Sequence, residues 1–169
     1  MLPFTGHIDP IWTLDELNAL DVETAPIRSS KTPAQPFIDA GHDLNRMMIR
    51  IYFEPNPMPA FVDKIKEQFS HLNNLSFAVN CIPAGNYLPW HEDGYDRYRN
   101  LRGLSTSDTI YRAIIMAEDG VPGQYLHVND QIYHNWKAGD WFAWYGATMH
   151  ATYNLSMQDR YAFQLTGTI

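Results

Sequence analysis

Residues 123–154 read GQYLHVNDQIYHNWKAGDWFAWYGATMHATYN, and this stretch indicates the fold of the chain. It contains four short runs rich in aromatic and β-branched residues, which are typical of strands. These runs lie at 124–128, 131–134, 141–145 and 149–153. Asn129-Asp130 predicts a two-residue hairpin between the first two runs. Ala138-Gly139-Asp140 predicts a turn before the third run, so the stretch favours antiparallel β structure.

The same pattern of short β-favouring runs separated by turn residues extends on both sides, from residue 75 to the end of the sequence. Further strands are predicted at 76–82, 86–90, 109–117 and 161–166. Eight short strands without an intervening helix are typical of a sandwich or jelly roll. The expected fold class is therefore mainly β, a cupin-like jelly roll with a few N-terminal helices that buttress one sheet.

The N-terminal part has a different pattern. Residues 13–20 predict a helix, because Thr13 is a good N-cap and Glu16 completes a capping box. An apolar stripe at helical spacing predicts a second helix over about 60–71. Residues 47–53 resemble a strand, and 22–40 resemble a loop. We expect one domain over 1–169, with a helical and loop part at 1–74 and a jelly-roll core at 75–169.

Composition and charge exclude several classes of protein. A net charge of −7 argues against general nucleic-acid binding and against electrostatic docking on anionic membranes. No apolar run approaches the roughly 20 residues of a membrane-spanning helix, and no signal peptide is visible. Cys81 is the single cysteine, which excludes an internal disulfide and a Cys-based zinc site within the chain. We expect a soluble cytoplasmic protein with no nucleic-acid or membrane partner.

Three residues form a candidate metal site. His91 and Asp93 are separated by one residue at the end of a predicted strand, so their side chains point the same way on extended chain. His150 begins a later predicted strand. Two imidazoles and one carboxylate are the ligand set of non-haem iron(II) sites with open positions. A lone His-x-Asp also occurs by chance, and His127 or His134 could compete with His150 as the third ligand.

Arg160 follows His150 by ten residues, after a short turn at 155–159. A hairpin would return the chain beside the metal, where the guanidinium could bind the distal carboxylate of a diacid. Taken alone, Arg160 could instead be a surface ion-pair partner of Asp159, and His150 could be a core histidine. The coincidence of all these residues in an all-β chain favours the metal site.

With these residues in view, the sequence resembles the 2-oxoglutarate/iron(II) oxygenases, nearest the aspartyl/asparaginyl β-hydroxylase-like and free-proline hydroxylase branch. The resemblance covers roughly residues 76–168. Its most telling stretch runs from Asn135-Trp-Lys-Ala-Gly-Asp140 through His150-Ala-Thr-Tyr-Asn154 to Arg160, and Ile82-Pro-Ala-Gly85 matches the turn ahead of the first metal histidine. It implies a double-stranded β-helix that binds iron(II) and 2-oxoglutarate, with ascorbate as reductant in vitro.

The resemblance also implies roles for further residues. Arg112 matches an arginine that approaches a carboxylate of cosubstrate or substrate, although it could equally be an edge-strand charge in solvent. Asn80 lies where the family carries a cosubstrate-contacting hydroxyl residue. Asp93 is a departure from the membrane-anchored β-hydroxylases, which often lack this carboxylate. Its presence favours hydroxylation and argues against a halogenase.

The expected function is thus a dioxygenase that uses O₂ and 2-oxoglutarate to hydroxylate an amino-acid-like or peptidyl substrate, or another small molecule. Arg97, Arg99 and Arg102, in the segment 94–107, could meet a carboxylate on that substrate or belong to a solvated loop. Two alternatives stay open: a cupin-like metal-binding module or non-oxygenase metalloenzyme, and a structural jelly roll. The sequence leaves the oligomeric state open.

A few other side chains have structural expectations. Asn154 is expected to cap a turn through its own side chain. Cys81 is expected to be a small buried hydrophobe. Four tryptophans are expected in the core and pocket wall: Trp90, Trp136, Trp141 and Trp144.

Overall fold

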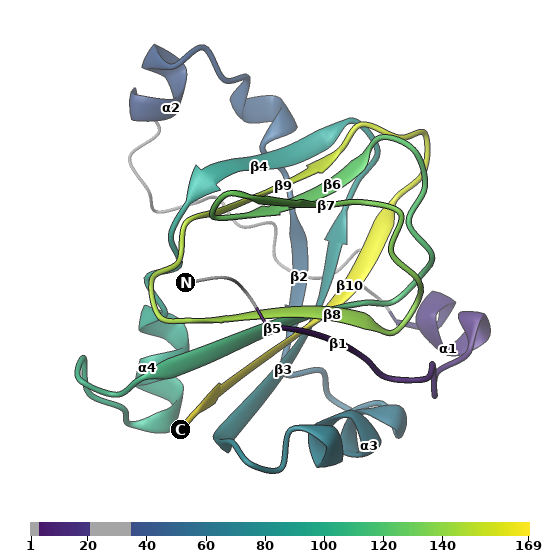
Figure 1. Cartoon of the computed structure of the whole chain (residues 1–169), viewed down its shortest axis with the longest axis vertical. Coiled ribbons are helices and arrows are strands. Elements are labelled where there is room, and N and C mark those ends of the chain that lie inside the picture. The colour runs from purple at the N-terminus through teal and green to yellow at the C-terminus, as the bar shows by residue number, and fades with distance from the viewer. Residues whose placement is uncertain (1–3, 21–34) are drawn as a thin grey trace.

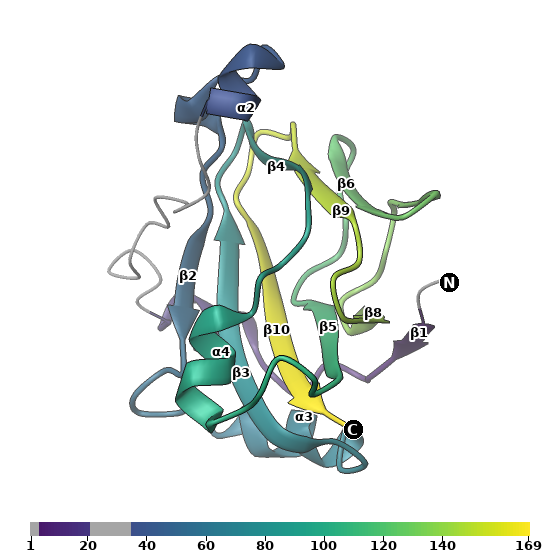
Figure 2. The same cartoon turned by 90° about the vertical axis from the view of Figure 1, so that its left-hand side faces the viewer.

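Two antiparallel sheets face each other in the computed structural model, which describes residues 4–20 and 35–169 (Figure 1). The six-stranded main sheet has the order β1-β8-β5-β10-β3-β2, and the four-stranded small sheet has the order β4-β9-β6-β7. The strands of the main sheet are β1 (Phe4–His7), β8 (Asp140–Tyr145), β5 (Ile110–Met116), β10 (Arg160–Thr168), β3 (Asn73–Ile82) and β2 (Arg50–Phe53). The strands of the small sheet are β4 (Asn86–His91), β9 (His150–Asn154), β6 (Gln124–Val128) and β7 (Gln131–Tyr133). A view turned by 90° shows β4, β9 and β6 to one side of β2, β3 and β10 (Figure 2).

The expected fold class is confirmed: the chain is mainly β, a double-stranded β-helix. All eight strands predicted from residue 75 onward are present, and β2 falls within the predicted run at 47–53. The predicted hairpin is also present, because Val128 pairs with Gln131 across Asn129-Asp130. β1 was not predicted; it pairs with β8 at the edge of the main sheet, so the N-terminal part is not helix and loop alone.

Of the four α-helices in the described residues, two were predicted and two were not, and a 3-10 helix (Leu44–Arg46) adds a further turn. α1 (Leu14–Asn18) has the predicted capping box between Thr13 and Glu16, and α3 (Phe61–Gln68) lies within the second predicted helix. α2 (Gln35–Asp39) occupies part of the loop predicted at 22–40, and residues 22–34 of that loop lie outside the described residues. α4 (Asp96–Arg102) lies in the segment 94–107, which was predicted to be a loop.

The main sheet is buried on both faces, which explains its long apolar strands. Phe163 and Leu165 of β10 pack with α1 and α3 on its outer side. Ala162, which directly precedes Phe163 and so points to the opposite face, packs toward the small sheet with Trp136 and Trp144. We call this second side, which faces the small sheet, the inner face of the main sheet.

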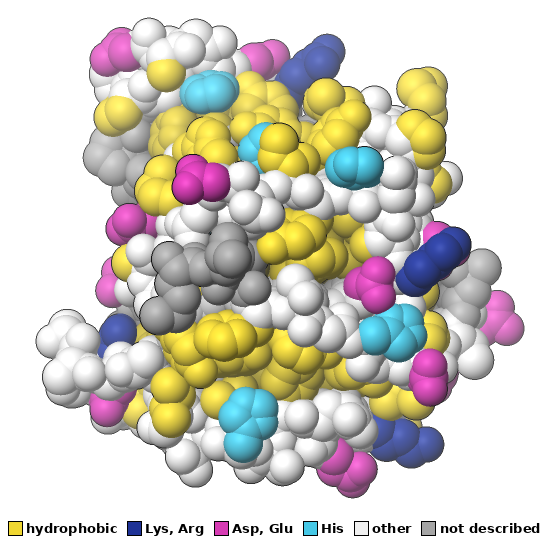
Figure 3. All heavy atoms as spheres, viewed as in Figure 1, with side chains coloured by type: hydrophobic (Ala, Val, Ile, Leu, Met, Phe, Trp, Pro, Cys, Tyr) yellow, Lys and Arg dark blue, Asp and Glu magenta, His cyan; other side chains and the backbone are white. Residues whose placement is uncertain are grey.

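The outer side of the small sheet is aromatic rather than charged. The rings of Tyr87 and Tyr153 stack at 5.9 Å, and His127 meets Tyr153 at 5.4 Å and Trp90 at 5.7 Å. Figure 3 shows hydrophobic and histidine side chains gathered over this sheet. Trp90 is 40% exposed, so the expectation that it lies in the core or pocket wall was wrong; Trp136 and Trp144 are buried as expected.

No helix in the described part of the chain is long and apolar enough to cross a membrane.

Candidate metal centre

The two histidines of the predicted metal site are brought together by the ladder of the small sheet. His91 is the last residue of β4 and His150 is the first of β9, and the two are register partners. Their ring centroids lie 4.2 Å apart. Residues opposite each other in an antiparallel pair lie on the same side of the sheet. Both imidazoles therefore occupy one end of the space between the two sheets.

A β-bulge sets the direction of His91. Leu88 pairs with Thr152 and His91 pairs with His150, so three steps along β4 match two steps along β9. In a regular strand, residues three apart point to opposite faces. The extra residue of the bulge restores His91 to the face of Leu88, and Pro89 is tolerated there because bulges free a backbone position from the ladder.

Hydrogen bonds to the backbone fix the tautomer of both rings. His91 Nδ1 lies 2.7 Å from the carbonyl oxygen of Pro89, and His150 Nδ1 lies 2.8 Å from that of Thr148. A carbonyl oxygen only accepts, so Nδ1 carries the hydrogen in each case. The lone pair of each neutral ring is then on Nε2, which is the arrangement that metal-binding histidines adopt.

His150 is buried against the core between the sheets. Its ring lies 4.8 Å from that of Trp144, and the residue is 8% exposed. Burial lowers the pKa of His150 to about 4, with the nearby His91 as the next cause. The imidazole is therefore neutral at physiological pH and can donate its lone pair to a metal ion.

Asp93 completes the group from the loop after β4. Its Oδ2 lies 4.0 Å from His150 Nε2 and 3.1 Å from an Nη of Arg112. One ligand atom from each of His91, Asp93 and His150 lies within 4.8 Å of the others. Two imidazoles and one carboxylate at this spacing could hold a divalent metal ion and leave further coordination positions open.

Arg160 begins β10 and points into the same space between the sheets, as Ala162 does two residues later. It is 5% exposed, donates from Nη1 to the carbonyl oxygen of Tyr125 at 3.2 Å, and lies over the ring of Trp136. Burial lowers the pKa of Arg160 to about 10, so the guanidinium stays charged at neutral pH. Among the described residues it has no carboxylate partner, so the surface ion pair with Asp159 does not form; Asp159 pairs with Arg50.

The remaining predicted residues also lie on the inner face. Asn80 pairs in register with Ala162, and Arg112 with Trp144, both of which pack between the sheets. Arg112 is 5% exposed on an interior strand, so the alternative of an edge-strand charge in solvent was wrong. Asn80 donates to Gln164 Oε1 at 3.1 Å.

Several buried polar atoms on this face have no hydrogen-bond partner within the described part of the chain. They are Asn80 Oδ1, Arg112 Nε, Trp144 Nε1 and Arg160 Nε. Buried polar groups are normally satisfied, because leaving one without a partner costs about 1–3 kcal/mol. A cluster of them on one internal face indicates a site that receives a polar ligand or ordered water.

Two histidines that could have competed for the metal lie elsewhere. His127 projects from the outer side of β6, between the buried Leu126 and Val128, and contacts Trp90 and Tyr153. His134 contacts Tyr125, which precedes His127 on the same side of β6. Neither belongs to the group formed by His91, Asp93 and His150.

The arginines at 97, 99 and 102 are engaged within the chain, so they do not form a solvated loop. Arg102 pairs with Glu54 Oε1 at 2.6 Å and donates to the carbonyl oxygen of Leu75. Arg99 donates to the carbonyl oxygens of Ser105 and Asp108. The guanidinium of Arg97 lies 4.5 Å from the ring centroid of Phe53.

Asn154 and Cys81 have the expected structural roles. Asn154 is fully buried, donates to the carbonyl oxygens of Ile82 and Gln158, and accepts from the backbone N–H of Ser156 at 3.3 Å. Cys81 is fully buried, and burial raises the pKa of its thiol to about 11, so it is a weak nucleophile.

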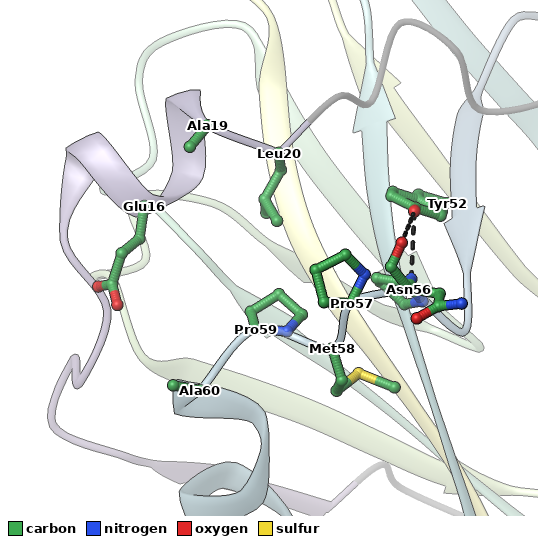
Figure 4. Close-up of a pocket in the computed structure, with 10 residues that line it drawn as sticks. Glu16, Ala19, Leu20, Tyr52, Asn56, Pro57, Met58, Pro59 and Ala60 are labelled. Carbon is green, nitrogen blue, oxygen red and sulfur yellow. Dashed lines mark hydrogen bonds between the residues drawn. The ribbon is translucent and has the colours of Figure 1, made fainter.

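A surface hollow lies on the other side of the main sheet, away from the three candidate ligands. Its walls come from the end of α1 and the segment before α3, and include Glu16, Leu20, Met58 and the ring of Tyr52 (Figure 4). The hydroxyl of Tyr52 is hydrogen-bonded to the backbone of Asn56. The described residues show no metal-binding group there.

Comparison with known proteins supports the fold. The structure is similar to that of a prolyl-4-hydroxylase from Pseudomonas putida, with a TM-score of 0.59 and 12% identity over 99% of this chain and 92% of that one. It also matches KdgF from Halomonas sp. (TM-score 0.45, 12% identity, 76% and 84% of the two chains) and a predicted oxalate decarboxylase from Thermotoga maritima (0.42, 11%, 72% and 82%). No family model and no curated protein matches the sequence.

Proposed function

We propose that this chain is a non-haem iron(II) dioxygenase that couples oxidative decarboxylation of 2-oxoglutarate to hydroxylation of an amino-acid-like or peptidyl substrate. The observation that carries the proposal is the joint presence, between the two sheets, of a His-Asp-His group and a buried arginine without a carboxylate partner among the described residues. The similarity of the fold to a prolyl-4-hydroxylase is consistent with it.

The metal would be held by His91, Asp93 and His150. Neutral imidazoles with Nε2 available and one carboxylate suit iron(II), and three protein ligands leave room for a bidentate cosubstrate and O₂. Zinc would accept the same donors, so the ligand set by itself does not distinguish an oxygenase from another metalloenzyme. The distinction comes from the second feature, the buried guanidinium.

Arg160 would bind the distal carboxylate of 2-oxoglutarate. A buried charge without a counter-charge is costly. The guanidinium of Arg160 is contacted only by the carbonyl oxygen of Tyr125 and the ring of Trp136 among the interactions described above. A carboxylate would supply the missing counter-charge and accept from Nε, which has no hydrogen-bond partner among the residues that the structure describes. Asn80, whose Oδ1 on the same face likewise has no partner in the described part of the chain, would contact cosubstrate or an ordered water.

Position along β6 relates this arginine to the metal ligands. Val128 is the register partner of His150, and Tyr125, whose carbonyl accepts from Arg160, is three residues earlier on the same strand. Three residues of extended strand span roughly 10 Å. The guanidinium and the metal ligands therefore lie toward two ends of one short stretch of β6, which suits a small diacid that spans between them.

Once bound, iron(II) and 2-oxoglutarate would supply the oxidising chemistry. The protein's own part is to orient and to shield. The backbone carbonyls of Pro89 and Thr148 hold the two imidazoles, and Trp136 and Trp144 exclude water from the space between the sheets. Within this class, we propose the β-hydroxylase-like and free-proline hydroxylase branch, because the stretch from Asn135 to Asn154 and Arg160 resembles it.

Binding of 2-oxoglutarate tests this assignment without the prime substrate. Anaerobic titration of the iron(II)-loaded protein with 2-oxoglutarate is expected to give a metal-to-ligand charge-transfer band. Arg160→Met removes charge-assisted hydrogen bonds worth about 1.5–3 kcal/mol, so the apparent Kd should rise roughly 10- to 100-fold. Arg102→Met, which breaks a part-buried ion pair elsewhere, is the matched control and should leave the Kd unchanged. Equal affinity in wild type and Arg160→Met would contradict the assignment of Arg160.

A further inference from the structure

Asp93 differs from the two histidines in how it is held. His91 and His150 are register partners in the small sheet, so the ladder fixes both of their backbones. Asp93 lies two residues beyond the end of β4, in a segment without strand pairing. A carboxylate on such a loop is not oriented by the ladder. A contact from outside the small sheet has to fix its direction.

Arg112 makes that contact from the opposite sheet. It lies on β5, between β8 and β10, and its side chain is 7% exposed. An Nη of Arg112 is 3.1 Å from Asp93 Oδ2, and the guanidinium carbon is 4.9 Å from the ring centroid of Tyr95. Tyr95 in turn donates from its hydroxyl to the carbonyl oxygen of Gly146 at 3.0 Å. One buried guanidinium thus contacts two residues of the loop that carries the carboxylate.

The ion pair also selects one carboxylate oxygen. Oδ2, which binds Arg112, is the oxygen that lies 4.0 Å from His150 Nε2. A guanidinium hydrogen bond on this oxygen fixes the plane of the carboxylate relative to both imidazoles. It also compensates the negative charge of Asp93, which is costly to bury without a partner.

We propose that Arg112 is a positioning residue that aligns Asp93 for the metal, and is not a binding residue for the carboxylate of cosubstrate or substrate. The inference rests on the proposed metal site of His91, Asp93 and His150. The sequence analysis expected Arg112 to approach a carboxylate of cosubstrate or substrate; the proposal instead assigns its observed contact, with the protein's own Asp93, the main role.

The two roles of Arg112 make opposite predictions for two affinities. A positioning residue controls metal affinity, because partners of metal ligands typically contribute 10- to 100-fold to it. A cosubstrate-binding residue controls the affinity for 2-oxoglutarate and leaves that for the metal unchanged. Metal affinity can be measured with Co²⁺ alone, whose visible spectrum also reports coordination geometry, so the test needs neither turnover nor a known substrate.

The experiment is a Co²⁺ titration of wild type, Arg112→Met, Asp93→Ala and the double variant. Arg112→Met is expected to raise the Kd for Co²⁺ about 10- to 100-fold. It should have little further effect in the Asp93→Ala background, because the arginine acts through that carboxylate. Arg112→Lys keeps the charge and should recover part of the affinity, with a Co²⁺ spectrum that differs from that of wild type.

Controls separate this role from a purely structural one. Arg102→Met breaks the ion pair with Glu54 and should keep the wild-type Co²⁺ affinity and spectrum. Thermal unfolding of the metal-free proteins shows whether each variant folds, and if Arg112→Met does not, Arg112→Lys carries the test through its Kd and spectrum. Wild-type Co²⁺ affinity and spectrum in the Arg112 variants would overturn the inference about Arg112 and leave the proposed function standing. Failure of the wild type to bind any divalent metal would overturn both the inference and the proposed function.

Discussion

His91 and His150 each engage a backbone carbonyl two residues earlier through Nδ1, so both rings are oriented without a metal. The choice of residue types was predictable from the sequence, because His-x-Asp at a strand end and a downstream strand histidine form a known ligand set. The choice of His150 over His127 was not decided by residue type. It follows from strand alternation, since His127 lies between two inward-facing residues of β6 and must point outward.

Arg112 shows what the sequence could and could not indicate. A single charged residue within Tyr111-Arg-Ala-Ile-Ile-Met116 predicts a buried partner, provided that the strand is interior. Whether β5 is interior depends on its pairing with β8 and β10, which are far away in the sequence. The partner, Asp93, could be identified only once the two sheets were placed face to face.

Burial of His150 predicts a pH dependence of stability. The pKa is about 4 in the folded, metal-free protein and about 6.5 in the unfolded chain. Between these values the unfolded state binds a proton that the folded state does not, so the free energy of unfolding falls as pH drops from 6.5 toward 4. The difference between pH 7 and pH 5 attributable to this group is roughly 2 kcal/mol, measured by urea denaturation of the metal-free protein. His150→Gln should flatten the dependence, and an unchanged slope in that variant would contradict the burial argument.

At the scale of elements, strands were predicted where turn residues and alternation agree, and helices where a cap or an apolar stripe is present. α4 was missed because its seven residues, DRYRNLR, carry no apolar stripe, and its N-cap Tyr95 makes no side-chain capping hydrogen bond. The bulge in β4 was missed because no local signal beyond Pro89 marks it. Its effect is nevertheless decisive, since it turns His91 to the inner side.

Gly139 carries the turn between β7 and β8, which the sequence predicted. Its φ is +90°, and a Cβ there would collide with the carbonyl oxygen of Ile8. The backbone N–H of Ile8 donates to the carbonyl oxygen of Gly139, so the two segments are held close together. Gly139→Ala is therefore expected to destabilise the protein by about 2–4 kcal/mol. Gly85→Ala is the matched control, because Gly85 has φ +75° with open space around it and should cost only the left-handed penalty of about 1–2 kcal/mol. Chemical denaturation compares the two, and equal losses would refute the collision.

For the whole molecule, the fold explains why the site requires both sheets. The small sheet supplies His91 and His150, the loop beyond β4 supplies Asp93, and the main sheet supplies Arg112, Arg160 and Trp144. The jelly roll itself was predictable from the eight short strands, although the expectation of no intervening helix was wrong, because α4 lies between β4 and β5. The convergence of residues 80, 112 and 160 on one inner face followed from no single motif, because it depends on the register of β3, β10 and β5.

The most direct test of the central claim is succinate formation from 2-oxoglutarate with added iron(II), ascorbate and O₂. Oxygenases of this class turn over cosubstrate slowly without a prime substrate, so the unknown substrate is not needed. Wild type and His127→Ala, which alters a histidine on the outer side of the small sheet, are expected to form succinate, whereas His150→Ala should lose at least 100-fold (about 2.7 kcal/mol). No succinate from an iron-loaded wild type, or equal succinate from His150→Ala, would contradict the proposed dioxygenase.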